Sequence, residues 1–160
     1  MRQPSECEPV SYTLQAIIGH RESFDAAHFD SLSIVGLADG LLLIPLTSAV
    51  RTRFDIPYLP LTDDGDDAPS APHQLNLFCS QLSRQGLIAY LEAEIFGGVG
   101  WQAHVLYRNG AAVGPPDISA DAINQALRLF GVQVDGHTDE FDAVGLGRHR
   151  DTDAWSNEQD

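Results

Sequence analysis

The hydrophobic pattern of the chain is clearest in two neighbouring runs, residues 87–96 and 101–108, which alternate as β-strands do. In the first run the odd-numbered positions are all apolar, whereas Glu92 and Glu94 occupy the other face. If the second run folds back antiparallel, only a register that pairs odd with odd residues keeps its odd-numbered apolar side chains on that same core face. These side chains are Trp101, Ala103, Val105 and Tyr107. The pattern therefore predicts a hairpin whose second face brings Glu92 and Glu94 beside His104.

Other strand-like patterns lie nearer the N-terminus. Residues 11–18 alternate in the way typical of a first strand. Asp39 and Gly40, which stand between two short apolar runs, favour a two-residue hairpin turn. The run Leu41–Ile44 is apolar on both faces, which predicts a central strand with something packed on each side.

Two segments have the spacing of helices with one buried face. The first carries apolar residues at i, i+3, i+4 and i+7, and Gly86 is placed to end it. These residues are Leu75, Phe78, Cys79 and Leu82. The second helix is predicted to have Ser119 as its N-cap and to end at Gly131.

Together these elements predict an α+β fold, a mostly antiparallel sheet with two or three packed helices. A parallel nucleotide-binding sheet is disfavoured, because it needs regular alternation of strands and helices. The length of 160 residues is typical of one domain. We expect a single domain over residues 1–160, with a loose leader at about 1–10, an acidic loop at about 55–73 and a loose C-terminal tail at about 151–160.

The charge balance narrows the classes of partner. The chain has 23 acidic and 9 basic residues, all of the latter arginine, and a formal net charge of -14. Such a surface repels phosphates, so direct binding of nucleic acid is not expected, whereas a basic protein would be attracted. Solubility, a GC-rich genome or a salty cytoplasm are alternative explanations of the same charge.

The compartment is inferred from the absence of targeting patterns. No apolar run approaches the roughly 20 residues needed to span a bilayer. The N-terminus carries Glu6, Glu8 and two prolines where a signal peptide has a basic start and an apolar core. We therefore expect a cytoplasmic protein that does not enter a membrane.

Glu92, Glu94 and His104 form the strongest candidate for catalysis or metal binding. Two carboxylates at i and i+2 of a strand point to one side, and the neighbouring strand could bring an imidazole within reach. Such a trio could bind a divalent metal or share a proton on a carboxyl group of raised pKa. The alternative is a solvated sheet face, on which each cross-strand pair contributes at most about 1 kcal/mol.

The acidic loop contains a run of aspartates, Asp63, Asp64, Asp66 and Asp67. This run lacks the ligand spacing and closing glutamate of a calcium-binding hand. We expect it to be solvated or to attract a cationic partner.

A cationic cluster, Arg148, His149 and Arg150, follows two flexible glycines. It could receive an anion or clamp onto carboxylates of the same chain, and the intramolecular contact is favoured on so acidic a protein. The chain contains none of the motifs GxSxG, GxxxxGKS/T or GxGxxG, so no nucleophile elbow or phosphate-binding loop is indicated.

Two blocks of the sequence resemble a family of small uncharacterised bacterial proteins. The first is YLEAEIFGGVGWQA at Tyr90–Ala103, and the second is INQAL at Ile123–Leu127 together with DEFDAVGLGRHR at Asp139–Arg150. The resemblance covers much of the C-terminal half, together with the strand-like start at Tyr12–Gly19. It implies a bacterial, cytoplasmic, single-domain protein and assigns a catalytic role to no residue.

Two functional hypotheses follow. The first is a small acidic, non-enzymatic interaction protein that binds and neutralises a basic partner, as immunity proteins do, with the aspartates of the acidic loop raising the rate of association. The alternative is a metal-assisted or acid-base enzyme that uses Glu92, Glu94 and His104 in a cleft closed by residues 139–150. A divalent metal is a possible cofactor only under the second hypothesis, and no other cofactor is indicated.

Overall fold

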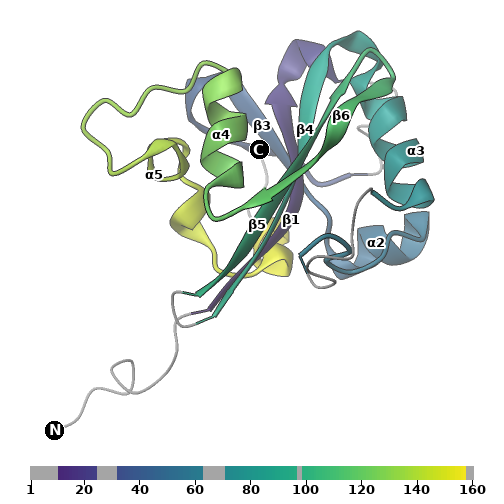
Figure 1. Cartoon of the computed structure of the whole chain (residues 1–160), viewed down its shortest axis with the longest axis horizontal. Coiled ribbons are helices and arrows are strands. Elements are labelled where there is room, and N and C mark those ends of the chain that lie inside the picture. Colours follow the sequence, from purple (N-terminus) through teal and green to yellow (C-terminus); the bar gives the residue numbers. More distant parts are fainter. Residues whose placement is uncertain (1–10, 25–31, 63–70, 97–98, 158–160) are drawn as a thin grey trace, which may run out of the picture.

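The computed structural model describes residues 11–24, 32–62, 71–96 and 99–157. These residues form a six-stranded antiparallel sheet in the order β2-β3-β1-β4-β5-β6, together with helices (Figure 1), and the predicted α+β fold is confirmed. The strands are β1 (Ser11–His20), β2 (Val35–Gly36), β3 (Leu41–Pro45), β4 (Leu87–Phe96), β5 (Val99–Arg108) and β6 (Ala111–Ser119). The α-helices are α2 (Ser48–Phe54), α3 (His73–Leu82), α4 (Ala122–Leu129) and α5 (Glu140–Val144). The predicted leader and the aspartates Asp63, Asp64, Asp66 and Asp67 lie outside the described residues.

Short 3₁₀ turns connect several of these elements. They are η1 (Arg21–Ser23), η3 (Ala38–Gly40), η5 (Ser83–Gln85), η6 (Leu146–Arg148) and η7 (Thr152–Asn157). The predicted turn at Asp39 and Gly40 is part of η3, which connects β2 to β3. Ser119 does not cap α4, because β6 extends to this residue and Ser119 pairs with Gln102.

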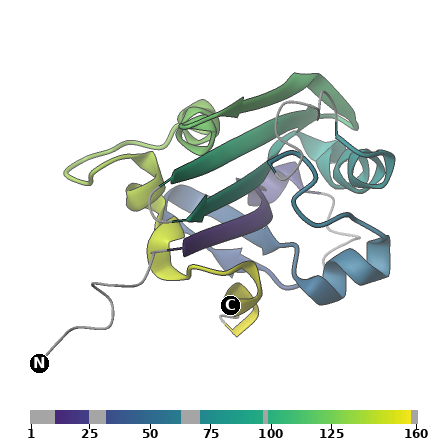
Figure 2. The same ribbon diagram turned by 60° about the horizontal axis from the view of Figure 1, so that its bottom comes forward.

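Both faces of the sheet are covered, with α2 and α3 on one side and α4 and α5 on the other (Figure 1, Figure 2). The first face packs Ile17, Ile44, Ile88 and Tyr90 against the stripe of α3 that the sequence predicts. The second face packs Leu14, Leu43 and Leu91 against Ile123, Ala126 and Leu127 of α4. Leu41–Ile44 is buried on both faces, as its uninterrupted apolar character predicts.

The register of β4 and β5 differs from the predicted one. Leu91 pairs with His104 and Glu92 pairs with Ala103, so odd residues face even ones and the prediction of an odd-with-odd register is wrong. The prediction treated one face of β4 as solvent. In the structure Tyr90 and Glu92 on that face are as completely buried as Leu91 on the other, because helices cover both.

The C-terminal segment, residues 150–157, packs along the half of β1 that β3 leaves unpaired. The amide of Thr13 donates to the carbonyl of Arg150 at 2.8 Å, and the amide of Gln15 donates to Oγ1 of Thr152 at 2.9 Å. Trp155, in η7, is completely buried in the second core. The prediction of a loose tail from residue 151 is therefore wrong over residues 152–157, since Trp155 is buried and the Thr152 side chain hydrogen-bonds to β1.

The first part of the predicted acidic loop is also packed. Ile56, Leu59 and Leu61 are buried, and Ile56 and Leu61 pack in the core on the α2 and α3 face of the sheet, so residues 56–62 are attached to the core although Pro57 and Tyr58 are exposed. We call residues 56–62 the anchored loop. Its attachment to the sheet depends on two buried polar side chains.

Candidate functional site

Glu92 is completely buried, and it accepts hydrogen bonds from the anchored loop and from its own strand. Its Oε1 accepts from the Tyr90 hydroxyl at 2.6 Å, and its Oε2 accepts from the Leu61 amide at 2.9 Å and the Thr62 hydroxyl at 2.7 Å. The Thr62 amide donates to the same oxygen. Burial raises the pKa of Glu92 above its ordinary value, and these hydrogen bonds offset the rise only in part. The carboxyl group thus works as an anchor for Leu61 and Thr62.

Gln15 holds the other half of the anchored loop. It lies directly opposite Glu92 in the pairing of β1 with β4 and is completely buried. Its Nε2 donates to the Pro57 carbonyl at 2.9 Å, and its Oε1 accepts from the Leu59 amide at 3.3 Å. Tyr58, between these two residues, is thereby placed at the surface, where its side chain is 53% exposed.

His104 lies on the other face of the sheet from Glu92. It pairs with Leu91, the neighbour of Glu92 along β4, and successive residues of a strand point to opposite faces. Its Nδ1 lies 2.7 Å from the carbonyl oxygen of Ala122 at the start of α4. The prediction that Glu92, Glu94 and His104 meet on one face is therefore wrong. Within the described residues, no group of three or more His, Cys, Asp or Glu side chains is arranged to hold a metal ion.

Glu94, in contrast, is exposed at the end of β4 and lies beside an exposed tryptophan. Trp101, on β5, is the direct cross-strand partner of Glu94 and is 54% exposed. Thr13, on β1, flanks Glu94 on the other side. Side chains that oppose one another across strands point to the same face. Thr13, Glu94 and Trp101 therefore form a row across three strands.

Tyr58 and Asp151 complete this surface. Burial raises the pKa of Tyr58, the nearby carboxylates of Glu94 and Asp151 raise it further, and Arg51 and a hydrogen bond from the Thr13 side chain lower it. The guanidinium of Arg51 lies 4.7 Å from the centre of the Tyr58 ring and donates to the Leu46 carbonyl at 2.8 Å. We call the patch formed by Thr13, Tyr58, Glu94, Trp101 and Asp151 the Tyr58–Trp101 surface. Glu94 is among the residues predicted from the sequence, whereas Tyr58 is not, because its position depends on the distant Gln15.

The cluster of Arg148, His149 and Arg150 makes contacts within the chain. Arg148 donates to the carbonyls of Gly36 at 3.1 Å and Gly145 at 3.3 Å, and its guanidinium lies 5.2 Å from the centre of the Trp155 ring. His149 meets the same indole edge to face, with 4.7 Å between ring centres. Arg150 contributes its backbone carbonyl oxygen, which accepts a hydrogen bond from the Thr13 amide in β1. These contacts hold the C-terminal segment, and binding of an external anion stays a prediction.

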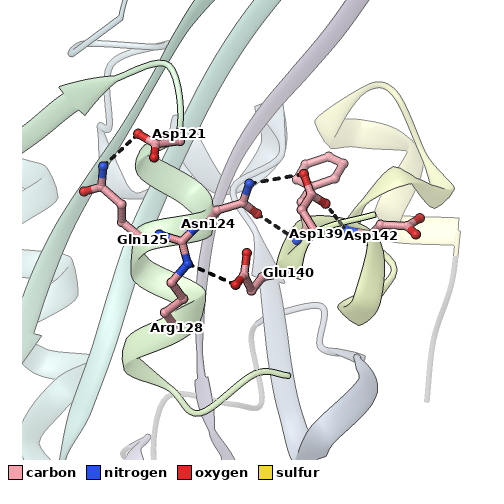
Figure 3. Close-up of polar contacts among 8 residues, drawn as sticks. Asp121, Asn124, Gln125, Arg128, Asp139, Glu140 and Asp142 are labelled. Atoms are coloured by element: carbon pink, nitrogen blue, oxygen red, sulfur yellow. Dashed lines mark hydrogen bonds and ion pairs between the residues drawn. The ribbon is translucent and has the colours of Figure 1, made fainter. Parts of the chain in front are cut away.

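A second polar cluster joins α4 to α5 (Figure 3). Asn124 donates from Nδ2 to Oδ2 of Asp139 at 3.2 Å and accepts from the Phe141 amide at 2.8 Å. Oδ1 of Asp139 accepts from the Asp142 amide at 2.9 Å and so caps α5. Arg128 pairs with Glu140 at 2.9 Å, and this hydrogen bond lowers the pKa of Glu140.

A pocket of about 240 Å³ opens beside this cluster on the α4 and α5 face of the sheet. Apolar and polar side chains from β1, β4, β5, α4 and α5 meet in it. They are Tyr12, Ile95, Gln102, Asn124, Asp139 and Phe141.

Comparison with protein-family models, with curated proteins and with solved structures gave no match to this chain. The resemblance to a family of small bacterial proteins stays a prediction. None of the helices in the described ranges has the length and apolar character that crossing a membrane requires.

Proposed function

We propose that this protein is a non-enzymatic interaction protein that binds a basic protein through the Tyr58–Trp101 surface. The observation that carries the proposal is the pair formed by Trp101 and Glu94. The indole is 54% exposed and lies directly across the strands from an exposed carboxylate. Tryptophan and tyrosine are the side chains most enriched among the residues that dominate binding energy at protein interfaces.

The chemistry of the surface suits arginine or lysine. A guanidinium or ammonium group attracted to the face of Trp101 can also hydrogen-bond to the carboxylate of Glu94, and Asp151 adds a second negative charge nearby. The patch itself contains no cationic member, although Arg51 borders it against the Tyr58 ring. Cationic side chains are therefore the complementary ones.

The backbone beneath the surface is already ordered. Glu94 and Trp101 lie in paired strands, and Tyr58 is fixed by the hydrogen bonds of Pro57 and Leu59 to Gln15. An ordered surface loses less conformational entropy on binding, which favours affinity.

The net charge of -14 also favours binding of a basic protein, because its attraction acts over longer distances than direct contact. A strongly acidic molecule attracts a basic partner before contact and raises the association rate at low salt. Asp63, Asp64, Asp66 and Asp67 follow the anchored loop along the chain, and their contribution to this rate stays a prediction. Binding that covers the active surface of the partner would neutralise it in the manner of an immunity protein.

The experiment compares the proteins retained from a host lysate by the wild type and by two variants, Trp101→Ala and Glu94→Gln. We expect a protein of pI above about 9 to be retained by the wild type and lost from both variants. Leu129→Ala and Glu22→Gln are matched controls, because Leu129 is 57% exposed on α4 and Glu22 is exposed in η1, at the other end of β1.

The retained protein is then purified and its affinity is measured by calorimetry. Loss of a central interface tryptophan typically costs at least about 2 kcal/mol, so Trp101→Ala should weaken binding about 30-fold, whereas the controls should leave it unchanged. Equal affinity of the wild type and both surface variants would refute the proposal.

A further inference from the structure

The pocket beside α4 and α5 lies on the opposite face of the sheet from the Tyr58–Trp101 surface. Ile95 lines it, whereas Glu94, the preceding residue of β4, belongs to that surface. The pocket can therefore be occupied independently of a protein partner. Its volume of about 240 Å³ lies just below the roughly 300–1,000 Å³ of pockets that hold drug-sized ligands, so its occupant is a smaller molecule.

One part of the pocket wall is apolar and fixed. The rings of Tyr12 and Phe141 meet edge to face, with 5.2 Å between their centres and 65° between their planes. The Tyr12 hydroxyl donates to the Leu146 carbonyl at 2.9 Å, which holds this ring in place. Ile95, opposite Tyr12 in the pairing of β1 with β4, adds an aliphatic side chain. This wall suits the body of a small apolar ring or chain.

The polar part of the wall presents a carboxylate and two amides. Asp139 accepts one hydrogen bond at each oxygen, from Asn124 and from the Asp142 amide, and a carboxylate has room for about four. Gln102 accepts from the Ile123 amide at 3.0 Å, which leaves its own NH₂ group to donate. In Figure 3 Asn124 points from α4 toward Asp139, so the carboxylate is positioned before any ligand arrives.

The charge of this wall is negative. The Arg128 ion pair with Glu140 and the His137 contact with Asp142 at 3.3 Å use other carboxylates. Asp139 accepts its hydrogen bonds from neutral amide donors, while the Arg128 guanidinium acts on it through its charge, and none of the described side chains that line the pocket is cationic. An anionic ligand is therefore disfavoured, and an ammonium group would meet a carboxylate that still has hydrogen-bonding capacity.

We propose that this pocket binds a small organic ammonium compound with an apolar body. The ammonium group donates to Asp139, the apolar body lies against Tyr12, Ile95 and Phe141, and Gln102 donates to any acceptor that the ligand carries. This inference does not depend on the proposed protein partner, since it concerns other residues on the other face of the sheet.

The test uses benzylamine as the probe, with benzyl alcohol and benzoate as neutral and anionic compounds of similar shape. Binding is followed by the amide resonances of the full chain in a two-dimensional NMR titration. We expect benzylamine to shift the side-chain amide signals of Gln102 and Asn124, and to bind at least about tenfold more tightly than benzyl alcohol. Equal binding of the three compounds, or no shift at Gln102 and Asn124, would overturn the proposal.

Two variants, each of which removes one negative charge, locate the interaction. Asp139→Asn removes the charge but keeps an oxygen that can cap α5, and it should weaken benzylamine at least about tenfold. Asp142→Asn is the matched control, because its carboxylate lies outside the pocket and pairs with His137. Ile95→Phe, which fills the pocket without touching its hydrogen bonds, should abolish the shifts. Unchanged benzylamine binding in Asp139→Asn or in Ile95→Phe would contradict the assignment.

Discussion

Removal of the buried carboxyl group of Glu92 provides a sharp test of how the fold is held together. Glu92→Ala removes the acceptor for the Leu61 amide, the Thr62 amide, the Thr62 hydroxyl and the Tyr90 hydroxyl, all of which are buried. A buried donor left without a partner costs about 1–3 kcal/mol. Four such donors set an upper range of about 4–12 kcal/mol.

The expected loss in the free energy of unfolding lies near the lower end of that range, about 4–5 kcal/mol. Water can enter the vacated space, the Tyr90 hydroxyl can rotate, and the cost of burying a charged group is no longer incurred. Small domains have a total stability of about 5–15 kcal/mol, so the change is large enough to bring the protein near unfolding at room temperature. Urea denaturation followed by circular dichroism measures it directly.

Glu92→Gln should cost less, about 1–2 kcal/mol at neutral pH, because the amide keeps one acceptor oxygen for the loop and the Tyr90 oxygen can accept from its NH₂ group. The cost should also depend on pH. Burial raises the pKa of Glu92 above its unfolded value of about 4.3. Protonation of Glu92 therefore stabilises the folded state fully below a pH of about 4.3, and this stabilisation is lost as the pH rises through the folded pKa. The glutamine variant lacks this titration, so its deficit should be larger at acidic than at alkaline pH.

Glu94→Ala is the control, because Glu94 is exposed two residues along the same strand and on the same face. It should change the unfolding free energy by no more than about 0.5 kcal/mol. Protection of the Leu61 and Thr62 amides against hydrogen exchange adds a local measurement, since both should exchange faster in Glu92→Ala. A loss of under about 1 kcal/mol in Glu92→Ala, with unchanged protection at these amides, would refute the anchoring role.

Two further predictions concern other parts of the fold. Trp155→Ala should lower the unfolding free energy by about 3–5 kcal/mol in urea denaturation, because the indole is completely buried. Leu129→Ala, at an exposed position, should cost under about 0.5 kcal/mol. Similar losses in the two variants would contradict the docking of the C-terminal segment. The Arg128 hydrogen bond lowers the pKa of Glu140, so its contribution to stability is present above the unfolded pKa of about 4.3 and is lost as the pH falls through the folded pKa. Arg128→Gln should therefore move the carboxyl titration of Glu140, followed by NMR, to higher pH, and an unmoved titration would show that the pair does not form in solution.

The strands and the helix stripe could be predicted because their signals are local. The alternation of residues 11–18 and 87–96 and the i, i+3, i+4, i+7 spacing of Leu75 to Leu82 place β1, β4 and α3 at the positions that the structure shows. The apolar run of β3 likewise predicts burial on both faces. Each of these inferences uses residues fewer than a dozen positions apart.

The register and the candidate site could not be predicted, because they depend on distant contacts. Glu92 is polar in sequence but buried in the structure, since its hydrogen-bond donors Leu61 and Thr62 lie about 30 residues earlier in the chain. A carboxylate on an alternating strand ordinarily indicates a face exposed to solvent. That assumption leads to the odd-with-odd register, and this register predicts that Glu92 and His104 meet on one face. The even-numbered residues Ile88 and Tyr90 were the available signal that this face is also core.

Synthesis of the protein is affected by two features of the C-terminal segment, the hydrogen bond from the Thr13 amide to the Arg150 carbonyl and the burial of Trp155. The start of β1 is made early, yet the residues that pair with its open edge follow every other strand along the chain. Until residues 150–157 leave the ribosome, that strand presents unpaired amides and carbonyls that another nascent chain can join. A stop codon shortly before Arg150 should therefore leave a product that aggregates even though all six strands of the sheet are present.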